Sequence, residues 1–130
     1  MDENSPVLRV LVVEDELLLR WSIAETLTQA GHVVIEAQDG ELAVQALTTA
    51  AGAVDAVVLD YRLPDSSDLT LLATIRRLSP GSAVILMTAY DTPEVTKGAI
   101  DLGAYQVMRK PFDMNDLEPV LLKACRSSRT

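Results

Sequence analysis

Short apolar runs alternate with segments of helical periodicity along the chain, and this alternation limits the possible folds more than any other feature. Five largely apolar runs predict strands at 7–13, 32–37, 56–60, 82–88 and 105–109. Strands that are apolar on both faces are typical of parallel sheets covered by helices on both sides. Five β-then-α units therefore predict an α/β fold, a single doubly wound five-stranded parallel sheet with five helices and right-handed crossovers.

The first helical segment carries clear packing and boundary signals. Trp21, Ala24 and Leu27 share one face of it, so we expect Trp21 to be partly buried. Gly31 is expected to end this helix. His32, the sole histidine, follows that glycine and is interpreted as a surface residue.

Two later helices contain a proline near their start. The segment 91–94, Asp-Thr-Pro-Glu, predicts the beginning of the fourth helix because it combines capping residues with an early proline. In the fifth helix Pro119 is tolerable if Asn115 is the N-cap and Glu118 closes a capping box. Otherwise we expect the helix to kink there.

Polar and charged side chains gather where the predicted strands end. In doubly wound sheets the functional site lies at the carboxyl ends of the strands. These ends carry Glu14-Asp15-Glu16 in the first strand, Asp60 in the third, Thr88 followed by Tyr90 in the fourth, and Lys110-Pro111 in the fifth. If the ends converge, the site holds several carboxylates, one hydroxyl and one ammonium group.

Such a set of side chains is suited to phosphoryl transfer. Neighbouring carboxylates repel one another, so they either take up protons or hold a cation. Hard oxygen ligands suit Mg²⁺, which would offset the charge of Glu14, Asp15 and Asp60. A carboxylate can then act as a nucleophile and become an aspartyl phosphate, while Thr88 and Lys110 meet the phosphoryl oxygens.

Composition narrows the class of protein. A chain of 130 residues fits one domain, and we place its core at about 8–125. The net charge of −8 argues against direct nucleic acid binding, because the phosphates would repel the chain. A single cysteine excludes an internal disulfide and favours a reducing, cytoplasmic location. No apolar run approaches a membrane span, so no membrane association is expected.

Four motifs together resemble the receiver domain of two-component response regulators. They are "VVEDE", "VVLDYRLPD", "MTAY" and "RKPF", which occur in this order and each at a predicted strand end. The resemblance covers roughly residues 8 to 125. It implies a flavodoxin-like sheet with the strand order 2-1-3-4-5. It also implies a phosphoacceptor domain that takes part in its own phosphorylation and dephosphorylation, and that is otherwise no enzyme.

The resemblance assigns roles to individual residues. Asp60 would accept a phosphoryl group from a histidine kinase or a phosphotransfer protein in a phosphorelay. Thr88 would hydrogen-bond that group, Lys110 would pair with it, and Tyr90 would swing inward on phosphorylation. The Lys110–Pro111 bond is often cis in the family. The Mg²⁺ ligands implied by the resemblance are Glu14, Asp15, Asp60 and the backbone carbonyl of Arg62.

The resemblance also implies a switch. Phosphorylation would change the face formed by the fourth helix, fifth strand and fifth helix, and so regulate an output domain, a partner or a second copy of the chain. Gly98 inside the fourth helix costs about 1 kcal/mol relative to alanine, which favours a marginally stable element there. The stretch "GAYQVMRKP" favours the receivers of nitrogen-regulation-type activators.

One position departs from the family pattern. Asp68 stands where the family commonly has glycine. Glycine there often serves a special backbone angle, for which aspartate is among the better substitutes. Asp68 could equally be the N-cap of the third helix.

Each site residue alone also has an ordinary explanation. Glu14, Asp15 and Glu16 could simply favour a helix N-terminus, and Asp60 could be a turn residue. Among other functions, a flavin site would need a phosphate-cradling first loop, and an aspartyl-phosphate hydrolase usually has a second aspartate where Arg62 stands. The main alternative is a pseudo-receiver, an interaction module that is never phosphorylated, which usually lacks one of the key residues.

Overall fold

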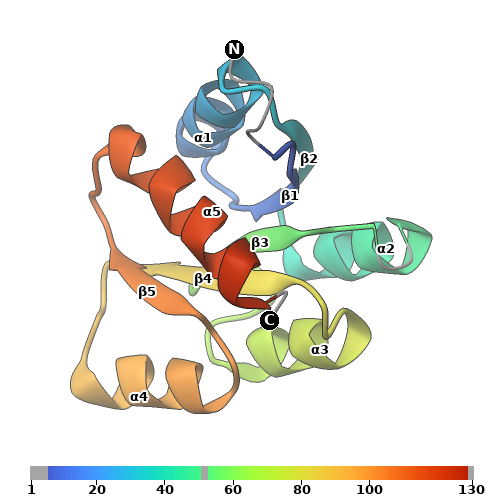
Figure 1. The fold of residues 1–130 in the computed structure, drawn as a ribbon. Coiled ribbons are helices and arrows are strands. Elements are labelled where there is room, and N and C mark those ends of the chain that lie inside the picture. Colours follow the sequence, from blue (N-terminus) through green and yellow to red (C-terminus); the bar gives the residue numbers. More distant parts are fainter. Residues whose placement is uncertain (1–5, 51–52, 129–130) are drawn as a thin grey trace.

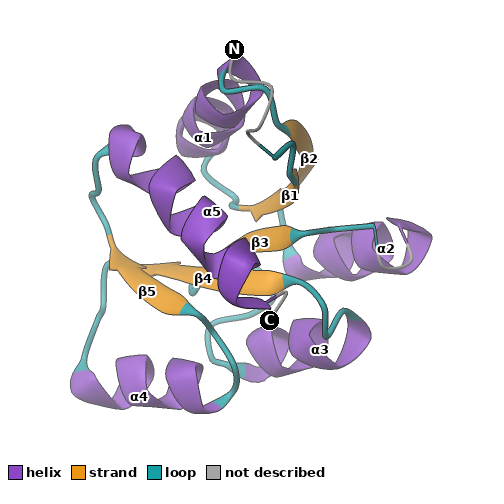
Figure 2. Cartoon of the chain, in the orientation of Figure 1, coloured by secondary structure: helices purple, strands orange, loops and turns teal. Residues whose placement is uncertain are grey.

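Five parallel strands form one sheet in the order β2-β1-β3-β4-β5, as predicted. The computed structural model describes residues 6–50 and 53–128. The strands are β1 (Arg9–Val13), β2 (Val33–Ala37), β3 (Ala56–Asp60), β4 (Ala83–Thr88) and β5 (Gln106–Arg109). The helices are α1 (Leu17–Gln29), α2 (Gly40–Ala50), α3 (Thr70–Leu78), α4 (Pro93–Asp101) and α5 (Leu117–Ser128), and the 3₁₀ turn η1 (Met114–Asp116) precedes α5. Figure 2 shows helices on both sides of the sheet.

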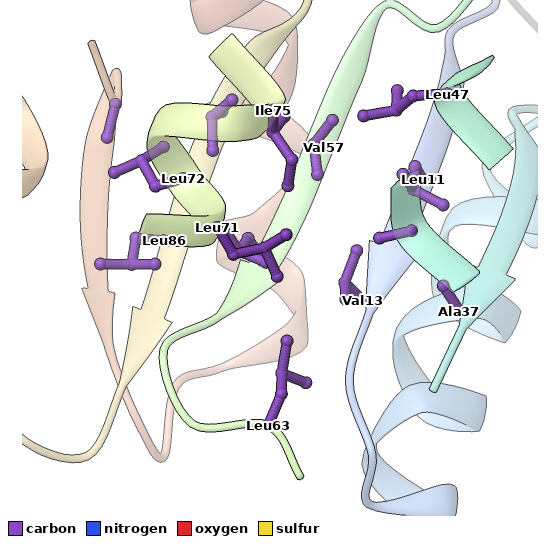
Figure 3. Close-up of a cluster of buried hydrophobic side chains, with 14 of the residues drawn as sticks. Leu11, Val13, Ala37, Leu47, Val57, Leu63, Leu71, Leu72, Ile75 and Leu86 are labelled. Carbon is purple, nitrogen blue, oxygen red and sulfur yellow. The ribbon is translucent and has the colours of Figure 1, made fainter. Parts of the chain in front are cut away.

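Two hydrophobic clusters cover the two faces of this sheet. Leu11 and Val13 of β1 point to the cluster formed with α2 and α3, which Figure 3 shows in close-up. Val10 and Val12 point to the other cluster, formed with α1 and α5. The strand period of two thus divides one apolar run between two cores. Among the described residues, no helix has the length and apolarity needed to cross a bilayer.

Helix α1 packs through a face that is rotated from the predicted one. Ile23, Ala24 and Leu27 are buried, whereas 58% of Trp21 is exposed, so the prediction of a partly buried Trp21 is wrong. At 100° per residue, Trp21 lies on the edge of α1 that is far from Ile23. Gly31 does end the helix, with φ of 96°.

His32 is buried, with 6% exposed, so its interpretation as a surface residue is wrong. Its Nδ1 accepts the N–H of Leu8 at 3.0 Å. The ring proton is therefore assigned to Nε2, which donates to Glu118 Oε2 at 2.6 Å. His32 thus connects the segment before β1 to the first turn of α5.

The start of α5 also differs from the prediction. Asp113 caps the preceding turn η1 by accepting the N–H of Asn115 at 2.9 Å, so Asn115 is not the N-cap. The carboxylate of Glu118 contacts His32 instead of closing a capping box. Pro119 lies in the first turn of α5, where a missing N–H costs little.

Helix α4 begins as predicted, and its Gly98 lies close to the side chain of Leu69, which precedes α3. Thr92 is its N-cap, and the Thr92 hydroxyl accepts the N–H of Val95 at 3.3 Å. A Cβ on Gly98 would lie 2.7 Å from Cδ1 of Leu69. A side chain at position 98 would therefore require the end of the Leu69 side chain to shift.

Asp68 takes a capping role one residue earlier than predicted. Leu69 is the N-cap residue of α3, while Asp68 Oδ1 accepts the N–H of Thr70 at 2.9 Å. This hydrogen bond from Thr70 lowers the pKa of the Asp68 carboxyl. Aspartate here therefore stabilises the beginning of α3.

Candidate functional site

The parallel register brings the predicted site residues to one edge of the sheet. Leu59 pairs with Val13, and Thr88 pairs with Arg109. The residues that follow these strands, Glu14 and Lys110, therefore lie beside Asp60 and Thr88 at the carboxyl ends. The prediction that these ends converge is confirmed.

Lys110 joins two buried carboxylates. Its Nζ lies 2.6 Å from Oε1 of Glu14 and 3.1 Å from Oδ1 of Asp60. Only 1% of Glu14 and 6% of Asp60 is exposed. Burial by itself would lower the pKa of Lys110, but the hydrogen bonds and charges of Glu14 and Asp60 outweigh it and raise this pKa. The ammonium group is therefore held in its charged form between them.

An acidic cluster at the same edge fits a divalent cation. Carboxylate oxygens of Glu14, Asp15 and Asp60 lie within 4.8 Å of one another. Asp15 is exposed, so a metal and its waters can reach it. Hard carboxylate oxygens in this number suit Mg²⁺, which keeps several of its waters. The cluster thus brings together the three carboxylates that the sequence predicts for Mg²⁺.

Thr88 and Tyr90 are linked but face different surroundings. Thr88 is buried, with 1% exposed, and its hydroxyl accepts the N–H of Tyr90 at 2.8 Å. The Tyr90 side chain is 51% exposed, and the guanidinium carbon of Arg62 lies 4.1 Å from the centre of its ring. Tyr90 therefore lies outside the core, stacked with Arg62.

The backbone after β5 holds Lys110 in place. The N–H of Lys110 donates to the carbonyl of Thr88 at 2.9 Å, which continues the pairing of β4 and β5. The Lys110–Pro111 peptide bond is cis. The predicted structural role of Pro111 is thus consistent with the observed backbone.

Two residues near the site were missed by the sequence analysis. Arg20 of α1 donates from Nη1 to the backbone carbonyl of Glu14 at 2.8 Å. Asp65, in the loop after β3, accepts the N–H groups of Gly40 and Glu41 at 2.9 and 3.0 Å, at the start of α2. The only sequence signals for them are that Arg20 lies one helical turn after Glu16 and that Asp65 follows a turn-forming proline.

An apolar groove begins beside Lys110. It has a volume of about 460 Å³ and lies between the start of α1 and the segment after β5, lined by Leu18, Leu19, Pro111 and Phe112 among others. Leu17, Leu18 and Trp21 of α1 are exposed next to it, at 64, 72 and 58%. This is a concentration of apolar side chains close to Asp60.

Comparison with known protein families yields one family match. Residues 10–121 match the model described as "Response regulator receiver domain". The transcriptional regulatory protein TcrA of Mycobacterium tuberculosis strain H37Rv is 37% identical over 109 residues, which cover 84% of this chain and 42% of TcrA. Across the first curated relatives, the chain spans between 31% and 54% of their lengths.

Solved structures give the same result. NtrX from Brucella abortus, in complex with ATP, superposes with a TM-score of 0.85 at 32% identity, over 95% of this chain and 28% of that one. A CheX–CheY–BeF₃–Mg²⁺ complex from Borrelia burgdorferi contains a chain with a TM-score of 0.83 and 26% identity, over 89% of this chain and 87% of that one. Matches to NtrC and NtrX proteins support the predicted relationship to nitrogen-regulation-type activators.

Proposed function

Because the chain belongs to the response regulator receiver domain family, whose members are phosphoacceptor switches of two-component signalling, we propose that Asp60 accepts a phosphoryl group from a histidine kinase or a phosphotransfer protein. The observation that carries this proposal is the Asp60 carboxylate at the end of β3, 3.1 Å from the Lys110 ammonium. In the transfer, an Asp60 oxygen attacks phosphorus, the P–N bond of the donor phosphohistidine breaks, and solvent supplies the proton that the leaving imidazole takes up.

The chain's own groups would receive the charge of the phosphoryl oxygens. Lys110 would exchange its contact with Asp60 for one with a phosphoryl oxygen, since its ammonium already lies beside that carboxylate. The Thr88 hydroxyl, which accepts a hydrogen bond from Tyr90, would donate its own proton to another oxygen. Such prepositioned donors are the main source of rate enhancement in phosphoryl transfer.

Mg²⁺ is the proposed cofactor. Glu14, Asp15, Asp60 and the backbone carbonyl of Arg62 would hold it, and the clustering of the three carboxylates supports this set. When bound, the ion would neutralise charge on the phosphoryl oxygens and the acidic cluster. The presence of Mg²⁺ with a beryllium fluoride in the CheY complex of Borrelia burgdorferi also favours this assignment.

Phosphorylation is proposed to act on the face formed by α4, β5 and α5. Thr88 would move toward the phosphoryl group, and Tyr90 would leave Arg62 and turn inward. The exposed position of Tyr90 fits the state before this change. The altered face would then regulate an output domain or partner, or bind a second copy of the chain. We propose that this domain does not itself bind nucleic acid.

The groove beside Lys110 is the proposed contact for the phosphodonor protein. Exposed Leu17, Leu18 and Trp21 lie next to the groove, so a partner that covers them would bring its phosphohistidine to Asp60. The matched relatives are longer than this chain and carry different names, and we propose no particular output domain. The cytoplasmic location predicted from the sequence remains a prediction.

Phosphodonor labelling tests the acceptor. Acetyl phosphate with Mg²⁺ should add one phosphoryl group to the wild type and none to Asp60→Asn, as measured by intact mass. Asp101→Asn, which changes an exposed carboxylate on α4, is the matched control and should be labelled like the wild type. Equal labelling of Asp60→Asn and wild type would reject Asp60. A complete lack of labelling in the wild type would favour the pseudo-receiver.

A further inference from the structure

We propose that Arg20 is a positioning residue for the proposed metal site, and that Glu36 holds Arg20 in place. This inference rests on the proposed function, because it concerns the shape of the loop that carries Glu14 and Asp15. Arg20 belongs to α1 and Glu36 to β2, and neither element supplies a proposed ligand. The two residues would act by fixing backbone geometry.

The side chain of Arg20 is largely shielded from water and makes two specific contacts. Its Nη1 donates to the backbone carbonyl of Glu14 at 2.8 Å, and its Nε lies 3.1 Å from Oε1 of Glu36. The Arg20 side chain is only 13% exposed, against 47% for Glu36. A guanidinium group presents its donors in a rigid fork, so one side chain can hold both acceptors at a fixed separation.

The backbone N–H of Glu14 is held in place as well, by the end of β2. The N–H of Glu14 donates to the carbonyl of Ala37, the residue after Glu36, at 3.0 Å. Both backbone polar groups of Glu14 are thus fixed, one by β2 directly and one by Arg20. The end of β2 therefore fixes the backbone of the loop that carries Glu14 and Asp15.

The carbonyl that Arg20 contacts controls the position of Asp15. It belongs to the planar peptide group that joins Glu14 to Asp15, so its direction fixes where the nitrogen and Cα of Asp15 lie. Rotation of this group would move the Asp15 carboxylate away from Asp60, with which it shares the acidic cluster. Metal affinity depends steeply on such outer contacts of a site.

A purely electrostatic role for Arg20 is the competing explanation. Arg20 would then act through its positive charge near Glu14, Asp15 and Asp60, and its removal would strengthen Mg²⁺ binding, because a positive charge repels the cation. Glu36 offsets that charge at 3.1 Å, which favours a geometric role instead. Variants can separate the effect of charge from that of geometry. Arg109 is a suitable control for charge, because it also lies at the carboxyl end of the sheet, pairs with Asp91 at 3.6 Å, and is 73% exposed.

Mg²⁺ binding to the unphosphorylated chain, followed by calorimetry, tests the proposal. Arg20→Met should weaken Mg²⁺ binding about tenfold or more, as loss of outer-shell contacts does at other sites. Arg20→Lys keeps the charge but loses the fork, and should also bind more weakly than wild type. Glu36→Ala removes the acceptor for Nε and should weaken Mg²⁺ binding as well, whereas Glu36→Gln retains an acceptor and should bind more tightly than Glu36→Ala. Arg109→Met, the charge control, should also bind as wild type does.

Amide chemical shifts supply a second readout that needs no metal. In Arg20→Met, the signals of Asp15 and Glu16 should move, while those of residues 56–60 in β3 stay in place and so show that the sheet is intact. Unchanged Mg²⁺ affinity in Arg20→Met, or an equal loss in Arg109→Met, would overturn the positioning role alone. Absence of Mg²⁺ binding in the wild type would overturn the proposed metal site together with this role.

Discussion

At the scale of single residues, Lys110 allows two carboxylates to stay buried, because its ammonium group pairs with both. Glu14 and Asp60 lie at the ends of neighbouring strands, and an unpaired buried carboxylate is strongly unfavourable. Lys110 supplies the positive charge that both need. Its contacts therefore stabilise the unphosphorylated fold, and the same ammonium would be available for the proposed phosphoryl group.

Lys110→Met should lower the free energy of unfolding at pH 7 by about 2 kcal/mol, because hydrogen bonds to charged groups are lost. The raised pKa of Lys110 means that this contribution is complete below its ordinary value of 10.5. It is lost as the pH rises through the folded-state pKa. Urea unfolding at pH 7, 9 and 11 should therefore show a constant difference up to pH 9 and a smaller one at pH 11.

The matched control for this substitution is Lys97→Met. Lys97 pairs with Asp101 on the surface of α4, with 78% of its side chain exposed, and its loss should change stability little. An equal effect of the two substitutions would show that the site contacts of Lys110 do not stabilise the fold.

His32 offers a second test at this scale. His32→Leu preserves bulk but leaves the buried N–H of Leu8 without its acceptor, so the free energy of unfolding should fall by about 1–3 kcal/mol. Thermal or urea unfolding measures the change. Glu118→Gln is the control, because its amide oxygen can still accept from Nε2. A His32→Leu protein as stable as wild type would mean that the two hydrogen bonds contribute nothing net.

At the scale of elements, the loop after β3 is fastened to α2. Both carboxylate oxygens of Asp65 accept N–H groups at the start of that helix. These hydrogen bonds, that of Gly40 first, lower the pKa of Asp65. The loop that follows Asp60 is thereby held against the helix that precedes β3 in the chain.

Asp65→Ala should lower the free energy of unfolding at pH 7 by about 0.5–1 kcal/mol, the lower part of the range for lost helix caps, since the carboxylate is exposed and screened by solvent. Because the folded-state pKa is lowered, this stability is present above the ordinary value of 3.8 and is lost as the pH falls through the lower folded value. Urea unfolding should therefore show the difference at pH 7 and little at pH 2.5. A difference that persists unchanged at pH 2.5 would contradict a role for the ionised carboxylate.

The elements show which parts of this structure the sequence could predict. Strand ends were predicted well because β3 and β4 are buried along their whole length, so apolar runs mark them directly. The convergence of Glu14, Asp60, Thr88 and Lys110 followed from parallel topology. Side-chain partners did not follow, because they depend on how helices rotate and where they begin. The burial of His32 required Glu118 of α5, and the exposure of Trp21 required the exact rotation of α1.

At the scale of the whole molecule, α4 is in contact with the segment that follows Asp60, through Gly98 and Leu69. Leu69 lies over Gly98, where a Cβ would be 2.7 Å from its Cδ1. A rearrangement around Asp60 can therefore reach α4 through this contact as well as through Thr88 and Tyr90. Glycine at position 98 therefore affects the packing of α4 against Leu69 as well as the helix propensity of α4.

Beryllium fluoride with Mg²⁺, a mimic of the phosphoryl group, should change amide hydrogen exchange in residues 88–110 and leave the centre of β1 unchanged. A shift from mostly inactive to mostly active needs a differential binding energy of about 5 kcal/mol. Sedimentation with and without the mimic would report whether the altered face binds a second copy. Asp60→Asn is the control and should not respond. Identical hydrogen exchange with and without the mimic would favour the pseudo-receiver over the phosphorylation switch.

The contacts of Lys110 also bear on how the chain can fold. Glu14 and Lys110 are 96 positions apart, and Asp60 comes from the strand between them in the sheet. An intermediate with β1 and β3 paired but β5 undocked would place these two carboxylates side by side without their cation, and like charges at short distance repel one another. Such intermediates are disfavoured, so folding approaches an all-or-none transition. The proposed acceptor site is therefore assembled only in a completely folded molecule, which would keep partly folded chains from accepting a phosphoryl group.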